Sequence, residues 1–162
     1  MNIFFLDKNP TLAAEYQCDK HVVKMILETT QMVCTAYQAR HGIKKDLYKP
    51  AFPHHPMTKW VGETYGNFNW ALTHLVALGI EYTLRYNKFH KCLYISEKLY
   101  MKYVEWKKWG GEFTTPPLCM PEQYKHDNFV EAYRNYYIGD KKRFAKYKNS
   151  KTPDFMLRKD LL

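Results

Sequence analysis

A helical stretch near the N-terminus carries the residue types that acid–base chemistry needs. At about 100° per residue on a helical wheel, His21, Lys24 and Glu28 share one narrow arc. Gln31 and Thr35 complete this polar row, and the rest of the wheel carries no charged residue. A helix that is apolar over most of its circumference is buried on most sides, so the row should face a cleft. A histidine, a lysine and a carboxylate in a cleft can transfer protons and activate a nucleophile.

The same row also has a purely structural interpretation. Lys24 and Glu28 are spaced i, i+4 and can form an ordinary ion pair on a helix surface. His21 can be a core histidine whose ring nitrogens are satisfied by hydrogen bonds. The residues of the row, taken alone, leave both interpretations open.

The elements around the row can be predicted from capping and breaking residues. Residues 2–6 form a short strand or an extended arm. Asn9 followed by Pro10 is typical of a helix start, and the helical sequence runs to Gly42 with a break near Cys18. Residues 43–56 are a proline-containing loop.

Further helices are expected along the rest of the chain. Their predicted ranges are Pro56 to about Tyr65, Phe68 to about Tyr86 with Asn67 as its cap, Lys91 to Trp106, and Pro121 or Asp127 to about Lys148. For the last of these helices, an interruption at Gly139 stays open. A long irregular segment that begins at Gly110-Gly111 separates the last two helices. The sequence predicts one all-α domain over residues 1–162, with a tail at 149–162 that docks or frays.

Composition favours a polyanionic partner. The chain of 162 residues carries 25 Lys+Arg against 16 Asp+Glu, a net charge of +9. Aromatic residues make up 17% of the chain, and tyrosine alone supplies 14 of them. Cations that hold phosphates and rings that stack on unpaired bases suit nucleic acid.

Other compositional features concern location. The four cysteines are far apart in sequence, which favours free thiols in a reducing compartment over a zinc knuckle or a redox pair. The apolar start is too short for a signal sequence, and no apolar run approaches the roughly 20 residues of a membrane span. We therefore expect a cytoplasmic protein without a membrane partner.

Four segments resemble a known family of enzymes. Asp19-Lys20-His21 followed by Glu28 is similar to the first helix of the phage pyrimidine-dimer DNA glycosylases, also called endonuclease V, and their bacterial relatives. That family has an Asp-x-His motif and a catalytic glutamate seven residues after the histidine, which is the spacing found here. The segments 48–60, 80–86 and 133–139 resemble later blocks of the family, in the same order.

The resemblance implies a fold and a reaction. The fold would be a small all-helical domain that needs no cofactor. Its N-terminal α-amine would attack the sugar C1′ of a damaged pyrimidine nucleotide, a Schiff base would form as the base leaves, and elimination could then cut the strand. Glu28 would stabilise the ionised sugar and assist proton transfer, and His21 would help to shape the site.

The chain departs from the family pattern around the nucleophile. The family has basic residues just before and after the glutamate, where this chain has Leu27 and Gln31. The family amine belongs to a small residue exposed by loss of the initiator methionine, but here Asn2 follows Met1. The amine could belong to Met1, to Asn2 after processing, or to Lys24. We expect the N-terminal amine, since an α-amine with a pKa of roughly 7.7–8.0 is partly neutral at physiological pH and an ordinary lysine at about 10.4 is not.

A larger set of residues is predicted to contact the nucleic acid. The run 141–148 is the densest basic segment of the chain and follows several tyrosines, although a solvated helix face would look similar. A metal site at His21, His54 and His55 is not predicted, because no acidic or cysteine ligand adjoins them. The predicted contacts are Gln31, His54, His55, Lys59, Arg85, Tyr133, Arg134, Tyr136, Tyr137, Lys141, Lys142 and Arg143.

The sequence therefore predicts a DNA-repair or DNA-processing enzyme that resembles a pyrimidine-dimer glycosylase and lyase. Its partner would be duplex DNA with a distorted or extruded base. Two alternatives stay open. One is a different enzyme on the same scaffold that modifies a nucleotide or a nucleic acid through Glu28 and His21. The other is a nucleic-acid-binding protein without catalysis.

Overall fold

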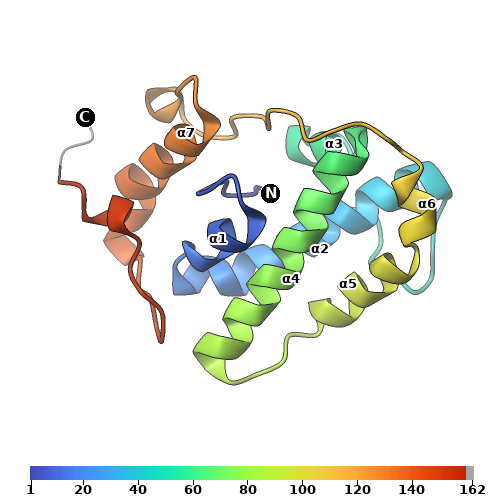
Figure 1. Cartoon of the computed structure of the whole chain (residues 1–162), viewed down its shortest axis with the longest axis horizontal. Helices are drawn as coiled ribbons and strands as arrows, with labels where there is room; N and C mark the ends of the chain where they lie inside the picture. The colour runs from blue at the N-terminus through green and yellow to red at the C-terminus, as the bar shows by residue number, and fades with distance from the viewer. Residues whose placement is uncertain (160–162) are drawn as a thin grey trace.

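In a computed structural model that describes residues 1–159, the chain is a set of packed helices, and no β-strand occurs within that range (Figure 1). This confirms the all-α prediction. The α-helices are α1 Pro10–Glu15, α2 Asp19–His41, α3 Pro56–Glu63, α4 Tyr65–Tyr86, α5 Cys92–Met101, α6 Tyr103–Lys107 and α7 Phe129–Tyr136. Short 3-10 or π turns cover Glu122–Tyr124, Tyr137–Lys141, Lys142–Phe144 and Asp154–Leu157.

The first helices begin and end where capping chemistry predicts. The Asn9 side chain accepts hydrogen bonds from the backbone of Thr11 and Leu12, which satisfies two of the free N–H groups at the start of α1. Pro10 occupies the first turn, where its missing N–H costs nothing. Gly42 ends α2 at a positive φ of 76°, a conformation that glycine adopts without strain.

Later helix boundaries differ from the predictions. Helix α4 begins at Tyr65, because the Thr64 hydroxyl caps it by accepting from the backbone N–H of Asn67 at 3.0 Å. Asn67 therefore lies inside the helix instead of capping it. The helix expected from Lys91 to Trp106 is divided at Lys102 into α5 and α6.

The C-terminal helical region is also shorter than predicted, and its α-helix ends just before Gly139, where the sequence left an interruption open. Helix α7 starts after Asn128, whose side chain accepts from the next turn, and it ends at Tyr136. One π turn and one 3-10 turn follow, and helical structure stops at Phe144 instead of about Lys148. Within the described part of the tail, Phe155 and Met156 are buried, so this part docks on the molecule. Residues 160–162 of the predicted tail lie outside the described residues.

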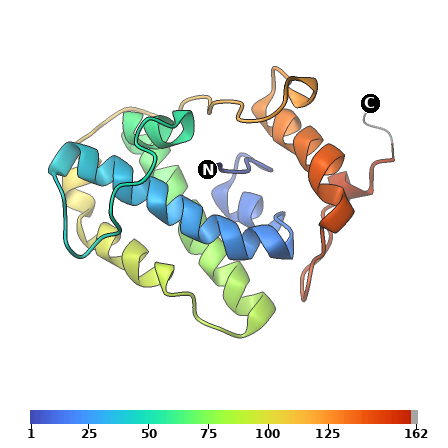
Figure 2. The same ribbon diagram turned by 180° about the vertical axis from the view of Figure 1, so that it is seen from behind.

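The N-terminal arm is part of the core. Figures 1 and 2 both show it in the middle of the molecule, with α7 on one side and α2 and α4 on the other. Phe5 is fully buried and its ring contacts Trp60, Trp70 and Tyr133 at centroid distances of 5.2, 4.6 and 5.4 Å. Burying one such side chain contributes about 1.5–3 kcal/mol. The arm is therefore held in place by its own apolar residues, and its first residue is carried to a fixed position.

The two long helices form the frame on which the arm rests. Helices α2 and α4 pack against each other, α3 packs on both, and α1 packs on α4. Figure 1 shows the segment between α6 and α7 passing across one end of this frame. No helix within residues 1–159 is long and apolar enough to cross a membrane.

Candidate active site

The N-terminal arm brings the α-amine to Glu28 in the middle of α2. The nitrogen of Met1 lies 3.5 Å from Glu28 Oε2. The backbone N–H of Asn2 donates to the same oxygen at 3.1 Å. An α-amine on Met1, or on Asn2 after loss of Met1, would thus lie beside one carboxylate. The N-terminal arm therefore folds back beside Glu28, which is necessary if the N-terminal amine is the nucleophile.

Polar contacts from distant parts of the chain hold the arm at this place. The Asn2 side chain donates to the carbonyl of Cys119 at 2.9 Å. The Tyr133 hydroxyl, which donates to the carbonyl of Pro117 at 2.7 Å, lies 3.4 Å from Asn2 Oδ1. Arg134 on α7 donates to the carbonyl of Leu6 at 2.8 Å and lies 3.4 Å from Asp7. The amine is therefore positioned from three directions before any ligand binds.

Lys24 approaches the same carboxylate from the other side. Its Nζ lies 3.7 Å from Glu28 Oε1, whereas the N-terminal amine faces Oε2. The Lys24 side chain is 69% exposed and that of Met1 is 4% exposed. Of the two amines beside Glu28, the N-terminal one is therefore covered by the protein and that of Lys24 faces outward.

His21 forms a buried wall of the site. Its ring stacks on Phe4 at 4.5 Å, and its Nδ1 lies 2.9 Å from the Tyr137 hydroxyl. The backbone N–H of Cys18 donates to that hydroxyl oxygen at 2.8 Å, which leaves the phenol hydrogen for His21 Nδ1. The ring hydrogen of His21 is therefore assigned to Nε2. Burial, reinforced by Lys141 and two other lysines, lowers the pKa of His21 to about 4, so the ring is neutral at physiological pH.

A second imidazole adjoins the amine and the carboxylate. His55 caps α3, with its Nδ1 accepting from the backbone N–H of Met57 at 3.1 Å. Burial lowers the pKa of His55, the N-terminal amine lowers it further, and Glu28 opposes them. The amine and Glu28 both act electrostatically on His55, where the sequence predicts only a contact with nucleic acid. His21 lies seven residues before Glu28 on α2, a rise of about 10.5 Å, so it walls the site instead of sharing a proton with the pair.

The exposed face of α2 differs from the prediction. Of the polar row, His21 and Thr35 are buried. Val23 and Leu27 are each 44% exposed. The row is thus the edge of a wider exposed face that includes aliphatic side chains. A helical wheel cannot show this, because it does not reveal which neighbours cover each side.

Several predicted nucleic-acid contacts lie on the surface. His54, Lys59, Lys142 and Arg143 are exposed. A second group is half-buried, and three of its four members have side-chain partners within the protein. Its members are Gln31, Arg134, Tyr136 and Lys141. Lys141, for example, lies 2.7 Å from Asp140 and packs over the ring of Tyr136.

Three predicted contacts need correction because their side chains are buried. Arg85 is 1% exposed, and it pairs with Glu81 at 3.0 Å and with Asp19 at 3.1 Å. Tyr133 and Tyr137 are fully buried, and their hydroxyls hold the arm and His21. These side chains build the site from inside the protein and offer no surface to nucleic acid.

Sequence reasoning missed two residues that shape the site, Phe4 and Cys119. Phe4 supplies the ring on which His21 stacks, and the carbonyl of Cys119 anchors Asn2. The apolar arm that carries Phe4 is visible in the sequence as a short run without charge. No local signal marks Cys119, because its role depends on a contact between segments 117 residues apart.

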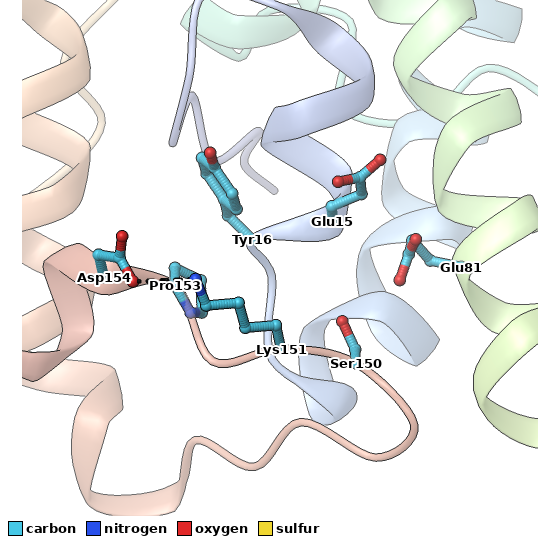
Figure 3. Close-up of a pocket in the computed structure, with 7 residues that line it drawn as sticks. All are labelled: Glu15, Tyr16, Glu81, Ser150, Lys151, Pro153 and Asp154. Atoms are coloured by element: carbon cyan, nitrogen blue, oxygen red, sulfur yellow. Dashed lines mark ion pairs between the residues drawn. The ribbon is translucent and has the colours of Figure 1, made fainter.

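A separate pocket lies between the end of α1 and the C-terminal segment (Figure 3). It has a volume of about 260 Å³, and its lining includes the carboxylates of Glu15, Glu81 and Asp154. Lys151 pairs with Asp154 at 3.3 Å. The pocket contains no residue of the amine–carboxylate pair, and its negative charge is unsuited to a polyanion.

The part of the chain that the structure describes contains no group of three or more His, Cys, Asp or Glu side chains that could hold a metal ion. The groups in direct contact at the candidate site are the amine and the Glu28 carboxylate, and the imidazoles of His21 and His55 belong to its surroundings. Comparisons with protein-family models, with curated proteins and with solved structures found no match to this chain.

Proposed function

We propose that this protein processes DNA by attacking the sugar C1′ of a damaged or modified pyrimidine nucleotide with its N-terminal amine. The observation that carries the proposal is the distance of 3.5 Å between the nitrogen of Met1 and Glu28 Oε2. A carboxylate at that distance can accept the proton that an ammonium group must lose before it attacks. The resemblance around His21 and Glu28 supports the same reaction.

The proposed step conserves atoms and electrons. The amine gives a proton to Glu28 and forms a bond to C1′ as the glycosidic bond breaks. The base leaves with the electron pair of that bond and takes up a proton from the attacking nitrogen. Glu28 then gives its proton to the ring oxygen O4′ as the C1′–O4′ bond breaks, which turns the new C–N bond into a protonated imine. Glu28 is again a carboxylate and stabilises the positive charge of the imine. Water can later hydrolyse the imine and restore the amine.

The surroundings of the pair suit a DNA substrate. The chain carries a net charge of +9, and Lys20, Lys24 and Lys59 are exposed. These cations can hold phosphates on either side of the reacting sugar. The reacting nucleotide must leave the base stack, which costs a few kcal/mol and favours bases that are already poorly stacked.

Borohydride trapping on abasic DNA tests the proposal. Reduction of the imine should leave a covalent protein–DNA adduct, and mass spectrometry of the digested adduct should place it on the N-terminal residue. Acetylating the N-terminus should eliminate trapping. Lys24→Met should leave much of the trapping, because the proposed nucleophile is the N-terminal amine and not the exposed side chain of Lys24.

The other outcomes separate the alternatives. An adduct that survives acetylation and is lost in Lys24→Met would move the nucleophile to Lys24. Absence of trapping with the wild-type protein would overturn the Schiff-base mechanism. Turnover of a nucleotide without trapping would then favour a different enzyme on this scaffold, and affinity alone would favour a binding protein.

A further inference from the structure

A groove at the start of α2 adjoins the candidate active site but takes no part in the proposed reaction. It has a volume of about 580 Å³ and lies between α2, the end of α4 and the segment that follows α7. Phe144 in its wall contacts the edge of the His21 ring at 5.7 Å. The lining also includes Lys20, Val23, Tyr86, Arg143 and Lys146.

The walls of the groove are held together by Asp19. Its backbone N–H donates to the carbonyl of Lys146 at 2.8 Å, and its carboxylate accepts from the backbone N–H of Lys148 at 3.0 Å. Arg85 pairs with the same carboxylate at 3.1 Å. The segment after α7 is therefore fixed to the first turn of α2, and the groove exists before a ligand binds.

The groove carries positive charge. Lys20, Arg143 and Lys146 are exposed, and within residues 1–159 none of them forms a salt bridge. Among the described residues, the only acidic one in its lining is Asp19, which shares the single charge of Arg85 with Glu81. An anion that enters the groove would meet three cations without displacing an internal ion pair.

The same groove also offers apolar and aromatic surface. Val23 is 44% exposed, and the rings of Tyr86 and Phe144 are half-buried. Lys20 and Arg143 already lie over the Phe144 ring, at 4.9 and 5.4 Å. A ligand that fits this surface needs a flat apolar body together with an anionic group, and a nucleotide combines the two.

We propose that the groove is a second nucleotide subsite, which holds a neighbour of the reacting nucleotide in the same strand. Its base would pack against Val23 and Phe144, and its phosphate would lie at Lys20 and Lys146. Val23 and Glu28 are separated by a rise of about 7.5 Å and a rotation of about 140° on α2, so the strand must curve around this helix from Glu28 past His21, whose ring Phe144 contacts, to the groove. This inference rests on the proposed function, and it predicts that the substrate is a strand and not a free nucleotide.

Binding of single-stranded oligothymidylate, compared with thymidine 5′-monophosphate, tests the subsite. A four-nucleotide oligomer should bind the wild-type protein more tightly than the monophosphate. Phe144→Leu should weaken oligomer binding by about tenfold, since stacking is removed while an apolar side chain is kept. Replacing Lys20 and Lys146 with glutamine should lower the slope of log affinity against log salt by about 0.7 for each phosphate that is no longer neutralised.

Matched controls lie on the far side of the molecule. Val104 is 68% exposed on α6, and Lys107 is exposed beside it. Val23→Thr should weaken oligomer binding, whereas Val104→Thr and Lys107→Gln should leave it unchanged. The substituted lysines are exposed and outside the core, so their variants decide between the outcomes if Phe144→Leu does not fold.

Two results would be decisive against the subsite, and they differ from a failure of the proposed function. Groove variants that bind the oligomer as the wild type does would overturn the inference, even if borohydride trapping at the N-terminus succeeds. Equal decreases in the groove variants and the control variants would overturn it as well. If only the groove variants bind the oligomer more weakly and borohydride traps no adduct, the nucleotide subsite is supported and the proposed amine reaction is overturned.

Discussion

The two ends of α2 carry nearly the same residue types in opposite arrangements. Toward its C-terminus, His41 stacks on Tyr37 and accepts a hydrogen bond from Trp109 Nε1 at 3.0 Å. Its Nδ1 lies 3.8 Å from Glu105, which also accepts a hydrogen bond from the Tyr37 hydroxyl. Every side chain of this cluster has a polar partner inside the protein.

The N-terminal half of α2 has His21 and Glu28, and Tyr137 from the turn after α7 joins them, but this set is open. The Nδ1 atom of the His21 ring is hydrogen-bonded to Tyr137. The Glu28 carboxylate lies beside two amines, that of Met1 and that of Lys24. A closed set of partners stabilises the fold, whereas an open set leaves a donor, a carboxylate and an amine for a ligand. Residue types alone therefore do not separate a structural cluster from a candidate active site.

The largest expected difference is between variants that remove the charge of Glu28 or that of Glu105, one carboxylate from each cluster. Glu28→Gln should lower turnover of the proposed DNA substrate by about 100-fold or more, because it removes proton transfer and stabilisation of the imine. Its affinity for DNA and its fold should stay close to wild type. Glu105→Gln should leave turnover unchanged.

Steady-state rates and DNA titrations on both variants check this contrast. Unchanged turnover in Glu28→Gln would contradict the assignment. Equal decreases in both variants would show that the two carboxylates act only through the fold. Unfolding of Glu28→Gln would point to a structural ion pair with Lys24.

A smaller effect is expected on stability at acidic pH. The pKa of His21 is lowered from 6.5 to about 4, mainly by burial. Between these values the unfolded chain binds a proton at this ring and the folded chain does not, so acidification favours unfolding. The stabilising contribution is complete above pH 6.5 and is lost as the pH falls toward 4, with a size of a few kcal/mol.

Urea unfolding at a series of pH values measures this dependence. His21→Gln should make the free energy of unfolding fall less steeply across the window from pH 6.5 to 4. His74 is buried as well, and burial also lowers its pKa to about 4, so part of the slope should remain. A slope that His21→Gln leaves intact would contradict the neutral, buried state of this ring.

The smallest expected effect concerns the basic run after α7. Lys141 pairs with Asp140 at 2.7 Å, and Lys142 donates to the carbonyl of Arg158 at 3.1 Å. Arg143 donates to the carbonyl of Asp140 at 3.3 Å through Nε alone, so among the described residues its two terminal guanidinium nitrogens stay available. Replacing all three should lower the slope of log affinity against log salt by about 0.9 on duplex DNA, the value for one neutralised phosphate.

Salt titrations of duplex binding measure that slope. Replacing Lys107 and Lys108, a basic pair at the opposite end of α2 from the candidate site, should not change it. A slope near the wild-type value in the triple variant would show that the run is only a solvated surface. A decrease of about 2.7 would show that all three cations contact phosphates despite their internal partners.

Local sequence alone determined much of the framework. The caps at Asn9 and Gly42, the break before Asp19 and the spacing of His21 and Glu28 are all readable from the chain. Helix starts, helix ends and helix faces depend on residues within a few positions of each other, so a sequence contains the necessary information.

The candidate site itself was decided by tertiary structure. Met1 meets Glu28 because an apolar arm is buried against α7 and the segment that carries Cys119, which are more than 100 residues away in sequence. The same packing buries Arg85, Tyr133 and Tyr137, which the sequence pattern assigns to the nucleic-acid surface. Whether a polar side chain is covered depends on what packs over it, and only the folded chain brings those distant partners together.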